Sequence, residues 1–143
     1  GIREALDQKA IEEKIPVLGI CLGMQLLTNA SEEGILPGLG WIAAETKKFN
    51  IGEDYKVPHM GWNTIKIKSN NKILTGIDDS YRFYFVHSYY VQVQDSSNSL
   101  LKCEYAIEFD AGINSENIYG LQFHPEKSHK FGKQLLKNFV ELC

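Results

Sequence analysis

The sequence predicts a mixed α/β domain, and three observations support this prediction. Helical patterns with one apolar face open the chain at 1–14 and close it at 129–143. A short apolar run at 15–21 passes directly into a helical pattern at 22–29, which is typical of a strand–helix unit in a parallel sheet. Later segments resemble antiparallel strands, and this combination indicates a mixed architecture. The 143 residues have the length of one domain, so we expect residues 1–143 to form a single domain.

In the first part of the chain, apolar spacing and turn residues define the elements. The run at 15–21 has the composition of a strand that is covered on both faces. Residues 31–40 are rich in glycine and proline and predict a loop, and WIAAETKKF at 41–49 predicts a strand. The apolar positions of the opening helix follow helical spacing and are Ile2, Ala5, Leu6, Ala10 and Ile11.

The rest of the chain consists mostly of predicted strands. KVPHMGWNTIKIK at 56–68 has a turn-like centre followed by alternation over 64–68, and NNKILTGIDD at 70–79 predicts a turn with a short helix. YRFYFVHSYYVQVQ at 81–94 gives the strongest strand signal. Two further strands are predicted at 100–107 and 118–125. The apolar face of the final helix contains Phe131, Leu135, Leu136, Phe139 and Val140.

Composition excludes several classes of function. The formal net charge is −3 and there is no basic run, so we expect no nucleic-acid partner. The apolar stretches are too short to cross a membrane. Three cysteines at wide spacing form no disulfide framework, and this usage fits a reducing cytoplasm.

GICLG at 19–23 places a cysteine between two glycines at the predicted strand-to-helix turn. A nucleophile in such a turn has a strained backbone, and neighbouring chains must pass close to it. The N-terminus of the following helix is expected to stabilise the thiolate of Cys21 and lower its pKa, while the N–H of Leu22 supplies half of an oxyanion hole. A small apolar residue buried at a tight turn is the alternative interpretation. Gln25 lies one helical turn further on, where it could bind substrate or satisfy local backbone groups.

LQFHPEKSH at 121–129 contains a candidate partner for this cysteine. Pro125 cannot donate to a strand ladder, so the strand should end near His124, at the sheet edge where parallel strands also place Cys21. Glu126 follows two residues later, where its carboxylate can fix the imidazole tautomer. A turn histidine beside a solvated glutamate is the alternative. His129 lies close in sequence, but no second ligand cluster accompanies it, so we expect no metal site.

PVLGICLGMQLL at 16–27 and LQFHPEKS at 121–128 resemble the class I glutamine amidotransferases, the triad-type glutaminases. The resemblance implies a flavodoxin-like mixed sheet flanked by helices, with no cofactor. It also implies that Cys21 attacks the side-chain amide of L-glutamine and releases ammonia, and that water then hydrolyses the glutamyl thioester. In this scheme His124 is the general base and then the acid, and Glu126 orients it.

The same resemblance implies the residues that bind the substrate. Gln25 matches the family's glutamine-contacting residue, and Glu33 in SEEG matches the carboxylate that receives the substrate's amino group. The backbone around His87, Ser88 and Tyr89 matches the strand that holds the α-carboxylate end. From the residues alone, Glu33 could equally be a solvated loop charge, and the side chain of His87 could be structural.

SEEG, GLGWI, VPHMGWN, YFVHSYY and KFGKQLLKNF are similar to one branch of the family, the glutaminase subunits of imidazole glycerol phosphate synthases in histidine biosynthesis. This similarity implies a heterodimer with a barrel-type cyclase subunit that receives the ammonia. A paralogous group that supplies ammonia for sugars of surface polysaccharides or flagellar glycans is one alternative, and a non-catalytic docking module is another. Hydrolases and peptidase-like proteins with a cysteine at this turn usually have histidine directly after it, whereas this chain has Leu22.

The family normally has an upstream segment with the first strands of the sheet and a Pro/Gly-rich loop that supplies the second oxyanion N–H. Residues 1–14 match the helix that should follow this segment. We therefore expect the domain to lack its first strands, with an uncovered edge on the strand that begins at Ile15. One lost oxyanion donor costs about 100- to 1,000-fold in rate, so we expect these 143 residues alone to be a weak glutaminase.

Overall fold

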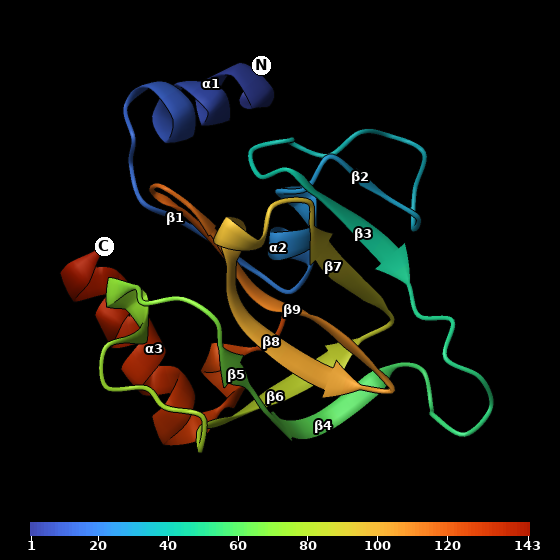
Figure 1. The fold of residues 1–143 in the computed structure, drawn as a ribbon. Coiled ribbons are helices and arrows are strands. Elements are labelled where there is room, and N and C mark those ends of the chain that lie inside the picture. The colour runs from blue at the N-terminus through green and yellow to red at the C-terminus, as the bar shows by residue number, and fades with distance from the viewer.

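The fold is built on an eight-stranded sheet with a separate two-stranded sheet beside it, as seen in a computed structural model that describes residues 1–143 (Figure 1). The α-helices are α1 (Ile2–Asp7), α2 (Leu22–Leu26) and α3 (His129–Leu142). The strands are β1 (Val17–Ile20), β2 (Ala30–Ser31), β3 (Ala44–Lys48), β4 (His59–Thr64), β5 (Lys66–Ile67), β6 (Arg82–His87), β7 (Tyr89–Val93), β8 (Ser99–Tyr105), β9 (Ile107–Ser115) and β10 (Ile118–Leu121).

The large sheet has the order β1-β10-β9-β7-β3-β2, with β8 paired to β9 and β5 to β8. Only the pairs β1–β10 and β2–β3 are parallel. In the first of these pairs, Ile20 stands opposite Leu121, so both strands end at the same edge of the sheet. The N–H of Cys21 extends the pairing by donating to the carbonyl of Leu121 at 2.7 Å. The predicted placement of Cys21 at the carboxyl end of a parallel strand is thereby confirmed.

Two hydrophobic clusters cover the two faces of β10. Ile118 packs in the cluster that contains Met24 of α2, whereas Tyr119 and Leu121 pack in the cluster that contains Leu135 of α3. Because successive side chains of a strand point to opposite faces, α2 and α3 lie on opposite sides of this strand. The strand ends that carry the candidate residues are therefore held between two packed layers.

Several expected elements are confirmed, and the largest differences concern burial. The opening helix forms as α1 and continues as a π-helix, η1 (Gln8–Glu12), yet Ala10 is the only residue of this segment that is buried. On α3, Val140 is exposed although it was assigned to the apolar face. The prediction that both faces of β1 are covered is met in part: Leu18 packs against the larger hydrophobic cluster and α2 contacts the strand, but Gly19 is the only fully buried residue and the other three are half-buried. Within residues 1–143, β1 pairs with β10 alone.

The region after residue 56 contains three further differences. The turn-like centre expected within 56–68 is strand, because β4 pairs with β6 over six residues from His59 to Thr64. The run 81–94 forms two strands rather than one: β6 belongs to the small sheet, and after Ser88 the chain enters the large sheet as β7. Strand β9 was missed beyond Ile107, where Asp110 and Gly112 interrupt the apolar pattern. The short helix expected at 70–79 is present as η2 (Lys72–Leu74).

The helices do not include a membrane span, because none is both long enough and apolar enough to cross a bilayer. The longest is α3 with 14 residues, and it packs beside β6 and η2 (Figure 1). Asn138 is buried in this contact and its amide donates to the carbonyls of Ile73 and Thr75. These bonds attach the last helix to the 3-10 turn η2.

Candidate active site

Cys21 occupies a strained turn between β1 and α2. Its backbone has φ 53° and ψ −108°, which is unusual for a residue other than glycine. A side chain at Gly19 would place its Cβ 2.6 Å from the backbone of Gly23, so the close approach of strand and helix requires glycine at 19. At Gly23 a Cβ would meet nothing within 4 Å. The expected close approach therefore applies to the first glycine of GICLG, and the second has open space.

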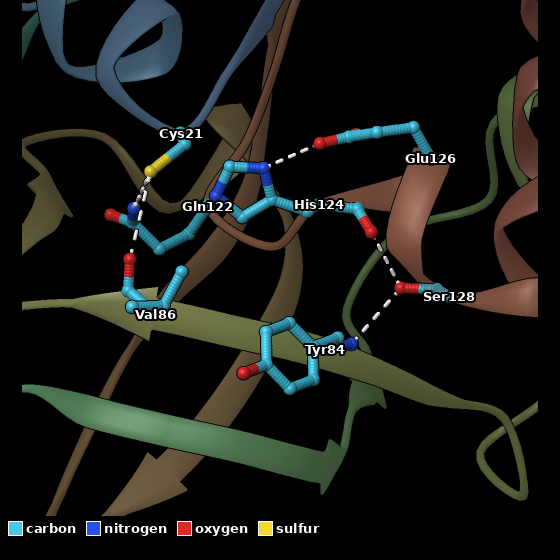
Figure 2. Close-up of polar contacts among 7 residues, drawn as sticks. All are labelled: Cys21, Tyr84, Val86, Gln122, His124, Glu126 and Ser128. Carbon is cyan, nitrogen blue, oxygen red and sulfur yellow. Dashed lines mark hydrogen bonds and ion pairs between the residues drawn. The ribbon is translucent and has the colours of Figure 1, made fainter.

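The sulfur of Cys21 lies between two polar groups that come from other strands. Its S–H donates to the carbonyl of Val86 at 3.8 Å, and Nε2 of Gln122 donates to the sulfur at 3.8 Å (Figure 2). The side chain is half-buried. Both contacts are long, as is usual for sulfur, and they leave the thiol oriented toward β6.

Burial raises the pKa of the Cys21 thiol, and the charge of Glu126 acts in the same direction. The backbone N–H of Leu22 and the amide of Gln122 lower the pKa, but their effect is smaller than that of burial. The N–H of Leu22 at the helix N-terminus lowers this pKa as expected, but burial outweighs it, so the pKa lies above the ordinary value and not below it. The helix has only five residues, so few aligned peptide dipoles oppose the cost of desolvating a thiolate.

His124 and Glu126 form a close pair, with 2.5 Å between Nδ1 and Oε1 (Figure 2). The regular strand β10 ends at Leu121, three residues earlier than the predicted end at His124. Pro125 begins a 3-10 turn, η4 (Pro125–Lys127), and this turn brings the carboxylate back to the imidazole. The pair results from local chain geometry at the end of β10.

The backbone of His124 is fixed to β6 by three hydrogen bonds. Its N–H donates to the carbonyl of Tyr84 at 2.9 Å, and its carbonyl accepts from Oγ of Ser128 at 2.7 Å. The same hydroxyl accepts from the N–H of Tyr84 at 3.0 Å (Figure 2). Ser128 is fully buried, so the histidine is held by a rigid closed ring of contacts.

Figure 2 shows the imidazole of His124 between Cys21 and Glu126. Glu126 occupies Nδ1, which leaves Nε2 available on the ring's other side. No hydrogen bond joins Cys21 to His124 in this arrangement, since the thiol donates to Val86. Hydrogen bonds between catalytic groups often tighten only when substrate is bound, so this arrangement is compatible with His124 as the base for Cys21.

A pocket of about 400 Å³ opens beside the sulfur. Its lining brings together Cys21 and all six residues that were predicted to bind substrate. His124 and Glu126 do not line this pocket. The full lining is Cys21, Leu22, Gln25, Glu33, Pro58, Val86, His87, Ser88 and Tyr89.

Two of the predicted substrate-binding residues, Glu33 and Gln25, differ in whether their side chains are already hydrogen-bonded. Glu33 is exposed at the pocket mouth, and no hydrogen bond engages its carboxylate. Gln25 is buried, and its Nε2 donates to the carbonyl of Tyr89 and to Oε1 of Gln122, both at 3.2 Å. The side chain of Gln25 thus satisfies a backbone group while it faces the pocket.

His87 is buried and hydrogen-bonded on both ring nitrogens. Nδ1 donates to the carbonyl of Tyr89 at 2.7 Å, and Nε2 lies 2.9 Å from Nδ1 of His59. Burial lowers the pKa of His87 to about 3 and that of His59 to about 4, so both rings are neutral at pH 7. The side chain of His87 supports the backbone that lines the pocket, as the structural interpretation of this residue predicts.

Sequence reasoning missed three groups of this site, namely Gln122, Ser128 and the carbonyl of Val86. Gln122 is fully buried although it is polar, and it lies in an otherwise apolar run two residues before His124. A polar side chain in such a run was the available signal. The Val86 carbonyl belongs to strand β6, and Ser128 is bonded to the same strand. The local sequence does not reveal where β6 lies.

The structure contains no group of three or more His, Cys, Asp or Glu side chains arranged to hold a metal ion. His129 is exposed and its ring stacks on Trp62 with 5.5 Å between centroids. It is therefore engaged on a surface away from the sulfur of Cys21.

The comparisons with protein families, with individual sequences and with solved structures agree with one another. The family model described as "Glutamine amidotransferase class-I" matches residues 1–143. The chain is 53% identical over 141 residues to "Imidazole glycerol phosphate synthase subunit HisH 2" of Methanococcus maripaludis, and 50% identical over 142 residues to the protein of the same name from Pseudomonas aeruginosa. These alignments cover 99% of this chain and 70% of each relative. A crystal structure of a glutamine amidotransferase from Thermotoga maritima matches with a TM-score of 0.61 and 23% identity, over 96% of this chain and 50% of that one.

Proposed function

Because the chain belongs to the class I glutamine amidotransferase family, we propose that it is the glutaminase part of an imidazole glycerol phosphate synthase. It hydrolyses L-glutamine to L-glutamate and ammonia, and the ammonia passes to a synthase partner in histidine biosynthesis. One observation carries the chemical part of this proposal. Cys21 and the His124–Glu126 pair follow two adjacent parallel strands, and the sulfur faces a pocket.

In the first half-reaction, the sulfur of Cys21 attacks the side-chain carbonyl carbon of glutamine while Nε2 of His124 accepts the thiol proton. The carbonyl oxygen becomes an oxyanion, which the N–H of Leu22 stabilises. When the tetrahedral intermediate collapses, the carbon–nitrogen bond breaks and His124 returns the proton to the leaving nitrogen. Ammonia departs and a glutamyl thioester remains on Cys21.

In the second half-reaction, His124 takes a proton from water as the water oxygen attacks the thioester carbon. Collapse of this intermediate breaks the carbon–sulfur bond, releases glutamate and returns the proton to Cys21. Glu126 keeps the proton on Nδ1 of His124 and stabilises the imidazolium that forms in both steps. A nucleophile, an acid–base group and water complete the reaction, so the proposed chemistry requires no cofactor.

The substrate lies in the pocket beside Cys21. Glu33 at the pocket mouth receives the α-amino group, since its carboxylate is exposed and unengaged. The backbone of Ser88 and Tyr89, with His87 behind it, holds the α-carboxylate end. Gln25 contacts the substrate from α2. Support for this arrangement is that all these residues line one pocket of about 400 Å³ together with the sulfur.

Efficient transfer of the ammonia to an acceptor requires a docked partner. In neutral water free ammonia is protonated and diffuses away, so an acceptor enzyme must take it up before that happens. The proposed partner is the cyclase subunit, which forms a heterodimer with this glutaminase. The similar proteins support this assignment, because each is described as a subunit of imidazole glycerol phosphate synthase.

The test measures glutamate released from glutamine by the intact protein, with and without the cyclase subunit, alongside Cys21→Ala. Release that rises with the cyclase and disappears in Cys21→Ala is the expected result. Release that depends on Cys21 but ignores the cyclase would contradict the histidine-pathway assignment and favour a sugar-amidating partner. Absence of release in every mixture would contradict the glutaminase itself and favour a docking module.

A further inference from the structure

Gln122 is fully buried between the candidate nucleophile and a substrate-facing residue. Its Nε2 lies 3.8 Å from the sulfur of Cys21, and its Oε1 accepts from Nε2 of Gln25 at 3.2 Å. The backbone N–H of Gln122 donates to the carbonyl of Ala111 at 2.9 Å. Both ends of this amide are therefore engaged, and its backbone is bonded to strand β9.

The orientation of the Gln122 amide follows from a single backbone carbonyl. The carbonyl of Tyr89 can only accept, so the group of Gln25 that faces it must be the NH₂. The same NH₂ then faces Gln122 and requires an acceptor there, which is Oε1. The NH₂ of Gln122 must consequently point to Cys21. If the amide of Gln122 were flipped, two NH₂ groups would face each other in a buried site without acceptors.

The Tyr89 carbonyl is itself held in place from its other side. Nδ1 of His87 donates to it at 2.7 Å, and the Nε2 of this ring accepts from Nδ1 of His59. The acceptor that sets the orientation of both glutamines is thus fixed by a buried histidine pair.

We propose that Gln122 is a positioning residue that directs an N–H at the sulfur of Cys21, with its orientation set through Gln25 by the carbonyl of Tyr89. This assignment rests on the proposed function in treating Cys21 as the nucleophile. In the resting thiol, the S–H donates to the carbonyl of Val86. Once the proton has left, Val86 presents only lone pairs to the sulfur, and the N–H of Gln122 is the side-chain donor that remains for the thiolate.

The test is the pH dependence of alkylation of Cys21 by iodoacetamide, measured on the intact protein and assigned by peptide mass spectrometry. Peptide assignment separates Cys21 from Cys103, which is buried, and from Cys143 at the chain end. The variants are Gln122→Met, which removes the donor at similar size, and Gln122→Glu, which replaces it with a carboxylate. Gln8→Glu, on the exposed surface of the opening helix, is the matched control.

In Gln122→Met we expect alkylation at pH 7 to slow by about three- to ten-fold, because the thiolate loses one hydrogen bond from a buried donor. The rate at high pH should stay unchanged, so that the whole profile shifts to higher pH. Gln122→Glu should shift it further, since a negative charge then lies beside the sulfur. Gln8→Glu should leave the profile in place.

Gln25→Met keeps Gln122 but removes the group that orients it, and it serves as the second test if Gln122 variants fold poorly. We expect a shift in the same direction as for Gln122→Met, and smaller. Profiles that coincide with the parent in both Gln122→Met and Gln25→Met would overturn the proposal. Alkylation does not require glutamine hydrolysis, so a shifted profile in a protein without glutaminase activity would retain this proposal and contradict the proposed function.

Discussion

Nδ1 of His124 lies 2.5 Å from Oε1 of Glu126, two residues further along the chain. Because a carboxylate can only accept, the neutral form of the imidazole carries its proton on Nδ1 and leaves Nε2 as the acceptor. The intervening Pro125 starts the turn that makes this contact possible. The tautomer that a general base requires is therefore set by three consecutive residues.

The first prediction concerns Glu126→Gln. An amide at this position can donate to Nδ1 and reverse the tautomer, so we expect kcat for glutamine hydrolysis to fall by about 100-fold or more, with little change in KM. Alkylation of Cys21 at pH 7 should become faster instead, because the charge of Glu126 raises the pKa of this thiol. Glu126 is exposed, so the melting temperature should stay close to that of the parent. A kcat within twofold of the parent would contradict the assigned role.

The two glycines of GICLG should respond differently to substitution. Gly19→Ala would place its Cβ 2.6 Å from the backbone of Gly23, so we expect a loss of about 2 to 4 kcal/mol in the free energy of unfolding. Gly23→Ala meets nothing within 4 Å and lies inside α2, so we expect a gain of about 0.5 to 1 kcal/mol. Urea denaturation of the two variants measures both effects. Equal losses for the two substitutions would contradict the close packing assigned to Gly19.

The strained turn at Cys21 should reduce the free energy of unfolding. Glycine adopts positive φ without penalty, whereas Cys21 has φ 53°. We expect the free energy of unfolding of Cys21→Gly to be about 1 kcal/mol higher than that of Cys21→Ala, because alanine keeps a Cβ in the same strained backbone. Chemical denaturation of the two inactive variants makes the comparison without interference from activity. If Cys21→Gly is the less stable variant, the turn is not strained.

The buried histidine pair predicts a loss of stability in acid. Burial lowers the pKa of His59 from 6.5 to about 4 and that of His87 to about 3. Below pH 6.5 the unfolded chain therefore binds more protons at these positions than the folded chain. The free energy of unfolding should fall as the pH drops from about 6.5 toward 4, by up to about 1.4 kcal/mol per pH unit for each histidine.

Urea denaturation at several pH values measures this slope. In His129→Gln, which changes an exposed histidine, the slope should remain. In His59→Gln it should become shallower, because one of the two buried rings is gone. A parent protein with constant stability between pH 7 and pH 4 would contradict the neutral, buried state of the pair.

The sequence predicts the parts of the site that depend on local signals. The short apolar runs before Cys21 and before His124 indicate two strands, and the structure confirms that the ends of these strands lie side by side. Helical spacing identified both terminal helices and α2. In each case the signal lies within a few residues of the feature it predicts.

The remaining features depend on partners that are distant in sequence. Strands β6 and β7 separate at Ser88 because they pair with β4 and with β3, which the composition of 81–94 cannot reveal. Burial of Cys21 reverses the expected direction of its pKa shift, and burial is a property of the packed structure. Gln122 was missed for the same reason, since its role depends on contacts with Cys21 and Gln25 from another part of the chain.

In the proposed mechanism, Cys21 forms a covalent glutamyl thioester whose formation depends on His124. The most direct measurement is acid quenching of the intact protein during turnover of isotopically labelled glutamine, followed by mass spectrometry of its peptides. The account predicts labelled glutamyl adduct on the peptide that contains Cys21, and none in Cys21→Ala or His124→Ala. Label on another residue, or label on Cys21 that is equally abundant in His124→Ala, would contradict it.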